Sequence, residues 1–126
     1  MQRHGNRDGK MKHLESSLQI TCVEYFDLKY PHLKQLLFHI PNGGKRNIRE
    51  AARLKRMGVR AGVADFFLAI PRGGYHGLFI ELKVGKGKLT DSQQAFTDAV
   101  AEKGYLTAEV RSVDGFIELI DKYYNY

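Results

Sequence analysis

Cysteine, tryptophan and proline are scarce in this chain of 126 residues, which contains one cysteine, no tryptophan and three prolines. The single thiol, Cys22, rules out an intrachain disulfide and a zinc site built from cysteines. A lone free thiol fits a reducing cytoplasm. No apolar run approaches the roughly 20 residues that a membrane-spanning helix needs, so we expect no association with a membrane.

Acidic residues are also in short supply. The chain carries 14 Asp and Glu against 20 Lys and Arg, which gives a formal net charge of +6. Such an excess favours a polyanionic partner, nucleic acid or an anionic membrane surface, although a basic protein without such a partner has the same charge. Hydrophobic residues make up 43% and charged residues 27%, as in ordinary soluble domains.

The first twelve residues, MQRHGNRDGKMK, are polar and lack the apolar centre of a signal peptide. We expect residues 1–12 to be a flexible basic tail or a remnant of cloning. The remaining length suits one compact domain and is too short for two, so we expect a single domain over residues 13–126.

Apolar periodicity and turn residues predict the secondary structure of this domain. The expected helices are Leu14 to about Tyr30, Ile48–Met57 after an Asn47 cap, Thr90 (as cap) to about Lys103, and about Val113–Tyr124. The expected strands are Leu36–Ile40, Val63–Ile70, Leu78–Val84 and Tyr105–Val110. The order α-β-α-β-β-α-β-α predicts an α/β fold in which a mixed sheet is flanked by helices.

Three ionisable residues interrupt the two central apolar strands: Asp65 lies in VADFFLAI, and Glu81 and Lys83 lie in LFIELKV. A carboxylate inside an apolar strand costs free energy unless another group compensates it. Side chains two apart share a strand face, so Glu81 and Lys83 point the same way. If the strands form a hairpin, Asp65 lies beside Glu81 on that face.

Two neighbouring carboxylates repel each other, and a divalent cation is their natural partner. Such a cation activates water for attack on phosphorus, and Lys83 would orient that water or neutralise charge on a phosphate. The alternative is that Glu81 and Lys83 form the solvated face of an edge strand. That alternative suits the E-x-K triplet alone, but it does not explain Asp65.

The first helix offers a further carboxylate. Glu15 begins this helix with Gln19 one turn later, so Glu15 either completes a metal site or simply interacts with the helix dipole. Glu24 is the rival candidate on the same helix. The residues alone leave this choice open.

Three segments together resemble a known family: Gly62-Val63-Ala64-Asp65, Phe79-Ile80-Glu81-Leu82-Lys83, and Leu89-Thr90-x-x-Gln93. They resemble the virus-type replication-repair nuclease (VRR-NUC) domain of the PD-(D/E)-x-K superfamily over roughly Leu14 to Tyr124. Ala64 replaces the usual proline, which shapes the backbone and carries no chemistry. The resemblance implies a restriction-endonuclease-like core.

The resemblance also implies metal-dependent hydrolysis of DNA. Asp65, Glu81, Glu15 and the backbone carbonyl of Leu82 would bind Mg²⁺ or Mn²⁺, Lys83 would assist the attacking water, and Gln93 would support the site or contact DNA. Free-standing members, from phages and bacteria, resemble Holliday junction resolvases that act as homodimers. We therefore expect a cytoplasmic, homodimeric enzyme acting on branched DNA. The C-terminal tyrosines, Tyr123, Tyr124 and Tyr126, are one candidate for the pairing surface.

Basic residues are concentrated between Lys45 and Arg60, where Glu50 is the single acid. Helical spacing puts several of them on one stripe suited to a phosphate backbone. A second basic loop follows the Glu81 strand. The expected DNA-binding residues are Asn42, Lys45, Arg46, Arg49, Arg53, Arg56, Lys86 and Lys88. A solvated helix face is the alternative. His39 would either touch DNA or cap its strand, and we favour the cap.

Other functions remain as alternatives. A flap-cutting or nicking nuclease of the same fold is the runner-up to a junction resolvase. An inactive DNA-binding domain has no need of buried carboxylates, and a basic protein-interaction domain leaves the charges in the strands unexplained.

Overall fold

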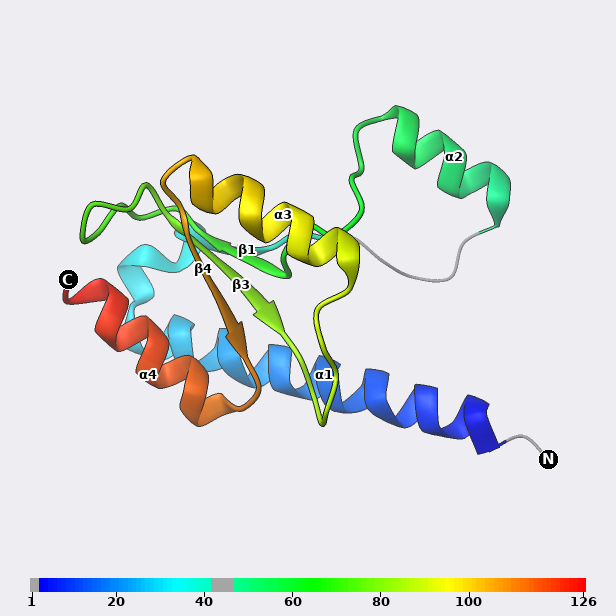
Figure 1. Cartoon of the computed structure of the whole chain (residues 1–126). Helices are drawn as coiled ribbons and strands as arrows, with labels where there is room; N and C mark the ends of the chain where they lie inside the picture. The colour runs from blue at the N-terminus through cyan, green and yellow to red at the C-terminus, as the bar shows by residue number, and fades with distance from the viewer. Residues whose placement is uncertain (1–2, 42–46) are drawn as a thin grey trace.

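The computed structural model describes residues 3–41 and 47–126, with side chains from Gly9 onward (Figure 1). The helical elements are α1 (Arg3–Lys29), the 3₁₀ helix η1 (Pro31–Leu36), α2 (Ile48–Arg56), α3 (Asp91–Glu102) and α4 (Val113–Tyr124). The strands are β1 (Leu37–His39), β2 (Phe66–Leu68), β3 (Leu78–Leu82) and β4 (Leu106–Val110). The α/β class and the predicted order of helices and strands are confirmed, with η1 as an addition.

The four strands form one mixed sheet in the order β1-β2-β3-β4. β1 pairs antiparallel with β2, and β2 pairs antiparallel with β3. β3 and β4 run parallel, since α3 forms the crossover between them. The predicted hairpin of the two central strands is therefore confirmed.

One face of the sheet packs against α1 and α4. Leu78, Ile80 and Leu82 alternate along β3 and are fully buried on this face. Phe116 of α4 lies 6.3 Å from Phe66 of β2, measured between ring centroids. This apolar layer fixes the positions of β2 and β3, and through them the side chains on the opposite face.

The opposite face carries α3 and an aromatic cluster. Phe79 of β3 lies 5.1 Å from Phe96 of α3 and 4.5 Å from Phe67 of β2, between ring centroids. Glu81 follows Phe79 by two residues and shares its face. The helix that covers this face therefore also covers Glu81.

Helix α2 stands apart from the sheet in Figure 1, and none of its residues is buried. The Asn47 side chain caps it as predicted, accepting a hydrogen bond of 2.7 Å from the backbone N–H of Glu50. In the described part of the chain, no helix combines the length and the apolarity that crossing a bilayer requires.

Some predicted boundaries were wrong. α1 begins at Arg3 rather than Leu14, because a helix that has already formed can propagate through polar residues without apolar periodicity. β2 covers only three of the eight residues expected, and Asp65 lies in a bend just before it.

One of the C-terminal tyrosines suggested as a surface for dimer formation is not accessible. Tyr123 is buried and donates a hydrogen bond to the carbonyl of Ile70, so it is not available as a pairing surface.

Candidate active site

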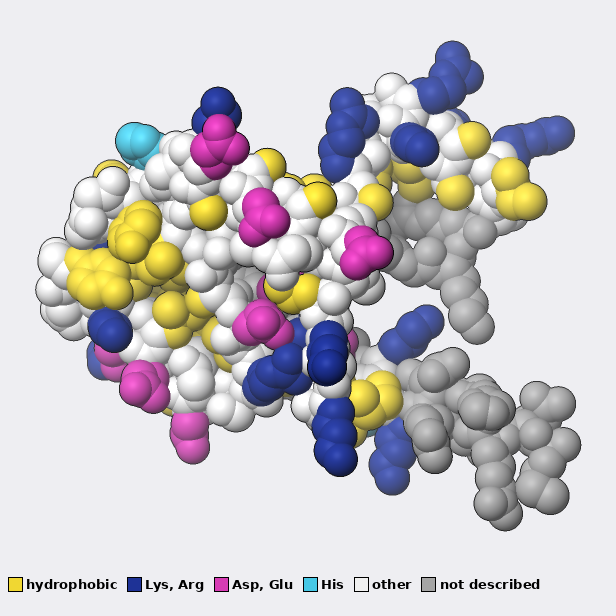
Figure 2. All heavy atoms as spheres, in the orientation of Figure 1, with side chains coloured by type: hydrophobic (Ala, Val, Ile, Leu, Met, Phe, Trp, Pro, Cys, Tyr) yellow, Lys and Arg dark blue, Asp and Glu magenta, His cyan; other side chains and the backbone are white. Residues whose placement is uncertain are grey.

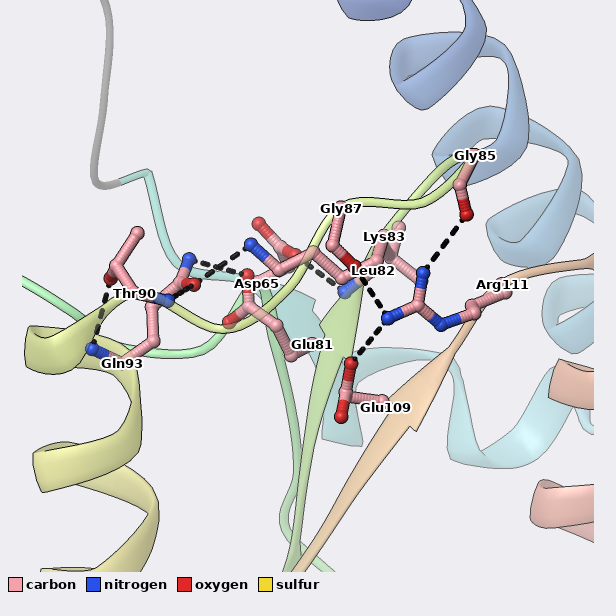
Figure 3. Close-up of polar contacts among 10 residues, drawn as sticks. All are labelled: Asp65, Glu81, Leu82, Lys83, Gly85, Gly87, Thr90, Gln93, Glu109 and Arg111. Atoms are coloured by element: carbon pink, nitrogen blue, oxygen red, sulfur yellow. Dashed lines mark hydrogen bonds and ion pairs between the residues drawn. The ribbon is translucent and has the colours of Figure 1, made fainter.

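The register of the central hairpin brings Asp65 and Glu81 together. Phe66 is paired with Ile80, so the residue before β2 comes opposite the residue after Ile80. The Asp65 carboxylate accepts a hydrogen bond of 2.7 Å from the backbone N–H of Leu82 (Figure 3). This carboxylate thus takes the place of a backbone acceptor and extends the pairing of the two strands by one step.

The backbone of Asp65 is held from its other side by the end of β1. Its carbonyl accepts hydrogen bonds of 2.8 Å from the N–H of Ile40 and from Nδ1 of His39. Because a carbonyl only accepts, His39 must carry its proton on Nδ1. His39 therefore ties its own strand to Asp65, which is close to the capping role that we favoured.

Glu81 is the only buried charged residue in the described part of the chain, with 8% of its surface exposed. Burial, followed by the negative charge of Asp65, raises its pKa to about 8 from an ordinary value of 4.5. Nearby Lys83 acts in the opposite direction without cancelling the effect. The site therefore holds a carboxyl group whose charged form lacks a sufficient partner.

Gln93 connects the ionisable groups. Its side-chain N–H₂ donates to Glu81 at 3.0 Å, and its side-chain oxygen accepts from the Lys83 amino group at 2.8 Å. The same oxygen accepts from the backbone N–H of Thr90 at 2.9 Å, and together with the predicted Thr90 cap this forms a capping box at the start of α3. One amide thus joins Glu81, Lys83 and the end of a helix (Figure 3).

Gly62 allows the segment before Asp65 to approach α3 closely. A Cβ placed on this residue would collide with the backbone of Ser92 and would lie 2.8 Å from the backbone nitrogen of Gln93. Gly62 also has a φ of +83°, which favours glycine. Glycine at this position therefore lets Gln93 reach the carboxylates.

Asp65, Glu81, Lys83 and Gln93 line a cleft of about 510 Å³ together with the middle of α1, residues 12–19. Glu15 faces this cleft, and burial followed by repulsion from Asp65 raises the pKa of its carboxyl group. Glu24 is exposed and lies outside the lining, so the structure brings Glu15 rather than Glu24 to the site. Lys12 and His39 also line the cleft.

The donor set suits a hard divalent cation, which prefers oxygen ligands. Asp65 and Glu81 supply carboxylate oxygens, and a cation would stabilise the costly charge on Glu81. The N–H of Leu82 points to Asp65. In an extended residue the carbonyl projects to the same side as the N–H, so the Leu82 carbonyl is also directed toward the carboxylates. However, no three His, Cys, Asp or Glu side chains among the described residues are grouped closely enough to hold a metal ion by themselves.

The expected DNA-binding residues fall in three places. Arg49, Arg53 and Arg56 are exposed on α2, as the helical stripe requires. Lys86 and Lys88 are exposed on the loop after β3. Asn42, Lys45 and Arg46 lie outside the described residues.

Sequence reasoning missed two residues beside the site. In the parallel register Glu109 is paired with Glu81, and it carries a further carboxylate at the edge of the same region. Arg111 bonds Glu109 and the loop after β3. The only available signal was the alternation of charges in Glu109-Val110-Arg111, which is common at strand ends.

Replacing Glu81 by glutamine should stabilise the metal-free protein at alkaline pH. The folded-state pKa lies above the unfolded value, so the favourable contribution of protonated Glu81 is complete below about pH 4.5 and is lost as pH rises through about 8. Glutamine stays neutral and can still accept from Gln93. We expect Glu81→Gln to melt roughly 5–10 °C above wild type near pH 9 and close to wild type near pH 5.

Differential scanning fluorimetry in EDTA measures this effect across the pH range. Asp98→Asn is the matched control, because Asp98 is an exposed carboxylate on α3. Parallel pH profiles for wild type and Glu81→Gln would contradict the assigned cost of ionising Glu81.

Comparison with known proteins places this geometry in a recognised group. The family model described as "VRR-NUC domain" matches residues 13–114. A solved structure titled "VRR_NUC domain protein" is similar over 88% of each chain, with 30% sequence identity and a TM-score of 0.76. A comparison with curated proteins gives no match.

Proposed function

Because this chain belongs to the VRR-NUC domain family, whose members are generally nucleases of the PD-(D/E)-x-K type, we propose that it is a divalent-metal-dependent DNA endonuclease acting on branched DNA. The family membership inferred from Asp65, Glu81-Leu82-Lys83 and Gln93 is confirmed. The catalytic roles and the substrate belong to this proposal.

The observation that carries the proposal is the buried Glu81 beside Asp65. This arrangement lowers the stability of the metal-free protein, because the raised pKa of Glu81 means that folding disfavours its charged form. A binding module gains nothing from such an arrangement. A hydrolase gains a site that attracts a divalent cation to an oriented pair of carboxylates.

The residues that would hold the cation are Asp65, Glu81 and the carbonyl of Leu82, together with Glu15, which lines the same cleft. A bound Mg²⁺ or Mn²⁺ supplies Lewis acidity and lowers the pKa of water. The protein contributes orientation: Leu82 fixes the Asp65 carboxylate, and Gln93 fixes that of Glu81.

Lys83 would act on the reacting phosphate. Gln93 holds the Lys83 amino group at the cleft. In this position the positively charged ammonium could orient the attacking water and stabilise the negative charge that develops on phosphate oxygens. The side-chain oxygen of Gln93 already accepts from Lys83 and Thr90, and its N–H₂ group holds Glu81, so we assign Gln93 a positioning role.

The DNA backbone would contact the exposed arginines of α2 and the lysines of the loop after β3. The preference for branched DNA and the homodimer rest on the family resemblance stated from the sequence. Exposed apolar side chains at Phe38, Ile48 and Met57 are surfaces that a second copy would cover. Two sites related by a two-fold axis would cut paired strands.

A panel of labelled substrates tests this proposal: a four-way junction, a flap, a plain duplex and single-stranded DNA, each with Mg²⁺. We expect paired cuts across the junction and slower cleavage of the duplex. Sedimentation velocity should give a dimer. Preferential cutting of flaps or nicking of duplex would keep the nuclease and reject the junction preference. Binding without cleavage of any substrate would support an inactive DNA-binding domain instead.

A further inference from the structure

The loop after β3, residues 84–89, joins two parts of the proposed active site. It begins directly after Lys83 and ends at Thr90, whose cap holds Gln93 in place. The loop also contains Lys86 and Lys88, and Figure 2 shows Lys and Arg side chains gathered over it. The conformation of the loop therefore affects the positions of Lys86 and Lys88, which are offered to DNA. It also affects the positions of Lys83 and Gln93, which lie next to its two ends.

Arg111 directly follows β4, and its side chain holds this loop through the carbonyl groups of the loop backbone. One terminal nitrogen of its guanidinium donates to the carbonyl of Gly85 at 3.1 Å, and the other donates to the carbonyl of Gly87 at 2.6 Å (Figure 3). The second nitrogen also donates to the Glu109 carboxylate at 2.9 Å. The guanidinium thus bridges the edge strand of the sheet and both glycines that flank Lys86.

Only arginine can make this pair of contacts. The planar guanidinium presents two terminal nitrogens in a fixed fork, whereas a lysine ammonium is a single point charge on a flexible chain. The loop forms a turn at Gly85 and Lys86 with a long backbone hydrogen bond, 3.3 Å from the N–H of Gly87 to the carbonyl of Val84, and Gly85 has a φ of +61°. Without the fork, this long bond would restrain the turn only weakly, and its two glycines would let the backbone take other conformations.

The charges around the loop are used differently. Arg111 has its charge matched by Glu109 in an ion pair. Lys86 and Lys88 are exposed, and neither has an ion-pair partner among the described residues. Arg111 is therefore committed to the protein, while the two lysines remain available to phosphate.

We propose that Arg111 is a positioning residue for DNA binding: its guanidinium fixes the backbone at Gly85 and Gly87 so that Lys86 and Lys88 face the substrate together. Arg111 acts through the loop and makes no essential contact with DNA itself. This inference rests on the proposed function, since it concerns how the same site holds DNA.

Replacing Arg111 by lysine removes the planar guanidinium fork but keeps the positive charge, so it tests the two contributions separately. If Arg111 positions the loop, Arg111→Lys should weaken DNA binding by roughly 5–10-fold although net charge is unchanged. The salt dependence should also become shallower, by up to about 0.9 for each lysine that no longer reaches a phosphate. Fluorescence anisotropy with labelled four-way junction and duplex, in EDTA to prevent cleavage, measures both quantities.

A double-mutant cycle identifies the route of the effect. In the Lys86→Ala/Lys88→Ala background, Arg111→Lys should cause no further loss of affinity. Arg72→Lys is the matched control, because Arg72 also donates to two backbone carbonyls, those of Pro71 and Tyr124, away from the cleft. Its binding should match wild type.

Wild-type affinity and salt slope in Arg111→Lys would overturn the inference, and so would full additivity with the two lysine substitutions. In both cases the wild type would still bind and cleave DNA, so the proposed function would stand. If the wild type neither bound nor cleaved any of these DNAs, the proposed function would fail and the inference with it.

Discussion

Asp65→Asn and Glu81→Gln should each lower the rate of DNA cleavage by about a thousandfold or more, because each removes a charge that the cation site requires. In Asp65→Asn the amide oxygen can still accept from the N–H of Leu82, and in Glu81→Gln it can still accept from Gln93. The fold and its hydrogen bonds should therefore survive. Single-turnover cleavage of labelled DNA in Mg²⁺ gives the rates.

The control for this prediction is Asp98→Asn, which removes an exposed carboxylate from the far part of α3 and should cleave at the wild-type rate. DNA affinity in EDTA should stay within about threefold of wild type for all variants, since phosphate contacts come from other residues. Cleavage at the wild-type rate by either Asp65→Asn or Glu81→Gln would remove that residue from the active site.

Charge reversal on α2 should have the largest effect on DNA binding. Arg49→Glu combined with Arg53→Glu replaces two exposed positive charges by negative ones on one face of the helix. We expect affinity to fall by roughly 10–100-fold and the salt slope to fall by up to about 1.8, from about 0.9 for each phosphate that is no longer neutralised. Titration by anisotropy across a range of salt concentrations measures both.

A control with the same change in net charge separates local contacts from a general electrostatic effect. Lys103→Glu with Lys122→Glu alters two exposed lysines, at the end of α3 and on α4, which lie outside the lining of the cleft. Equal reductions in affinity for both double variants would mean that α2 contributes only to overall charge. An unchanged salt slope in the α2 variant would make its stripe a solvated helix face.

The sequence predicted the features that follow from local pattern. The bounds of α4 and the Thr90 cap of α3 depend on residues that are close together in the sequence. The pairing of Asp65 with Glu81 could also be anticipated, because two apolar strands joined by a Gly-rich turn form a hairpin. The fold and the central carboxylates could therefore be predicted together.

The remaining features depend on contacts between distant segments. The choice of Glu15 over Glu24 depended on which turns of α1 lie along the cleft, and this is set by tertiary packing. The role of Gln93 as a link between Glu81 and Lys83 needed the close approach that Gly62 allows. Arg111 was missed because its partners in the loop are backbone carbonyls, which leave no trace in side-chain patterns.

The most direct test of the central claim is cleavage of a labelled four-way junction and a duplex by the purified wild type and Asp65→Asn, first in EDTA and then after addition of excess Mg²⁺. We predict no cleavage by either protein in EDTA, and recovery of cleavage in the wild type alone once Mg²⁺ is present. Cleavage by the wild type in EDTA, or equal cleavage by Asp65→Asn in Mg²⁺, would contradict a metal-dependent nuclease centred on Asp65 and Glu81.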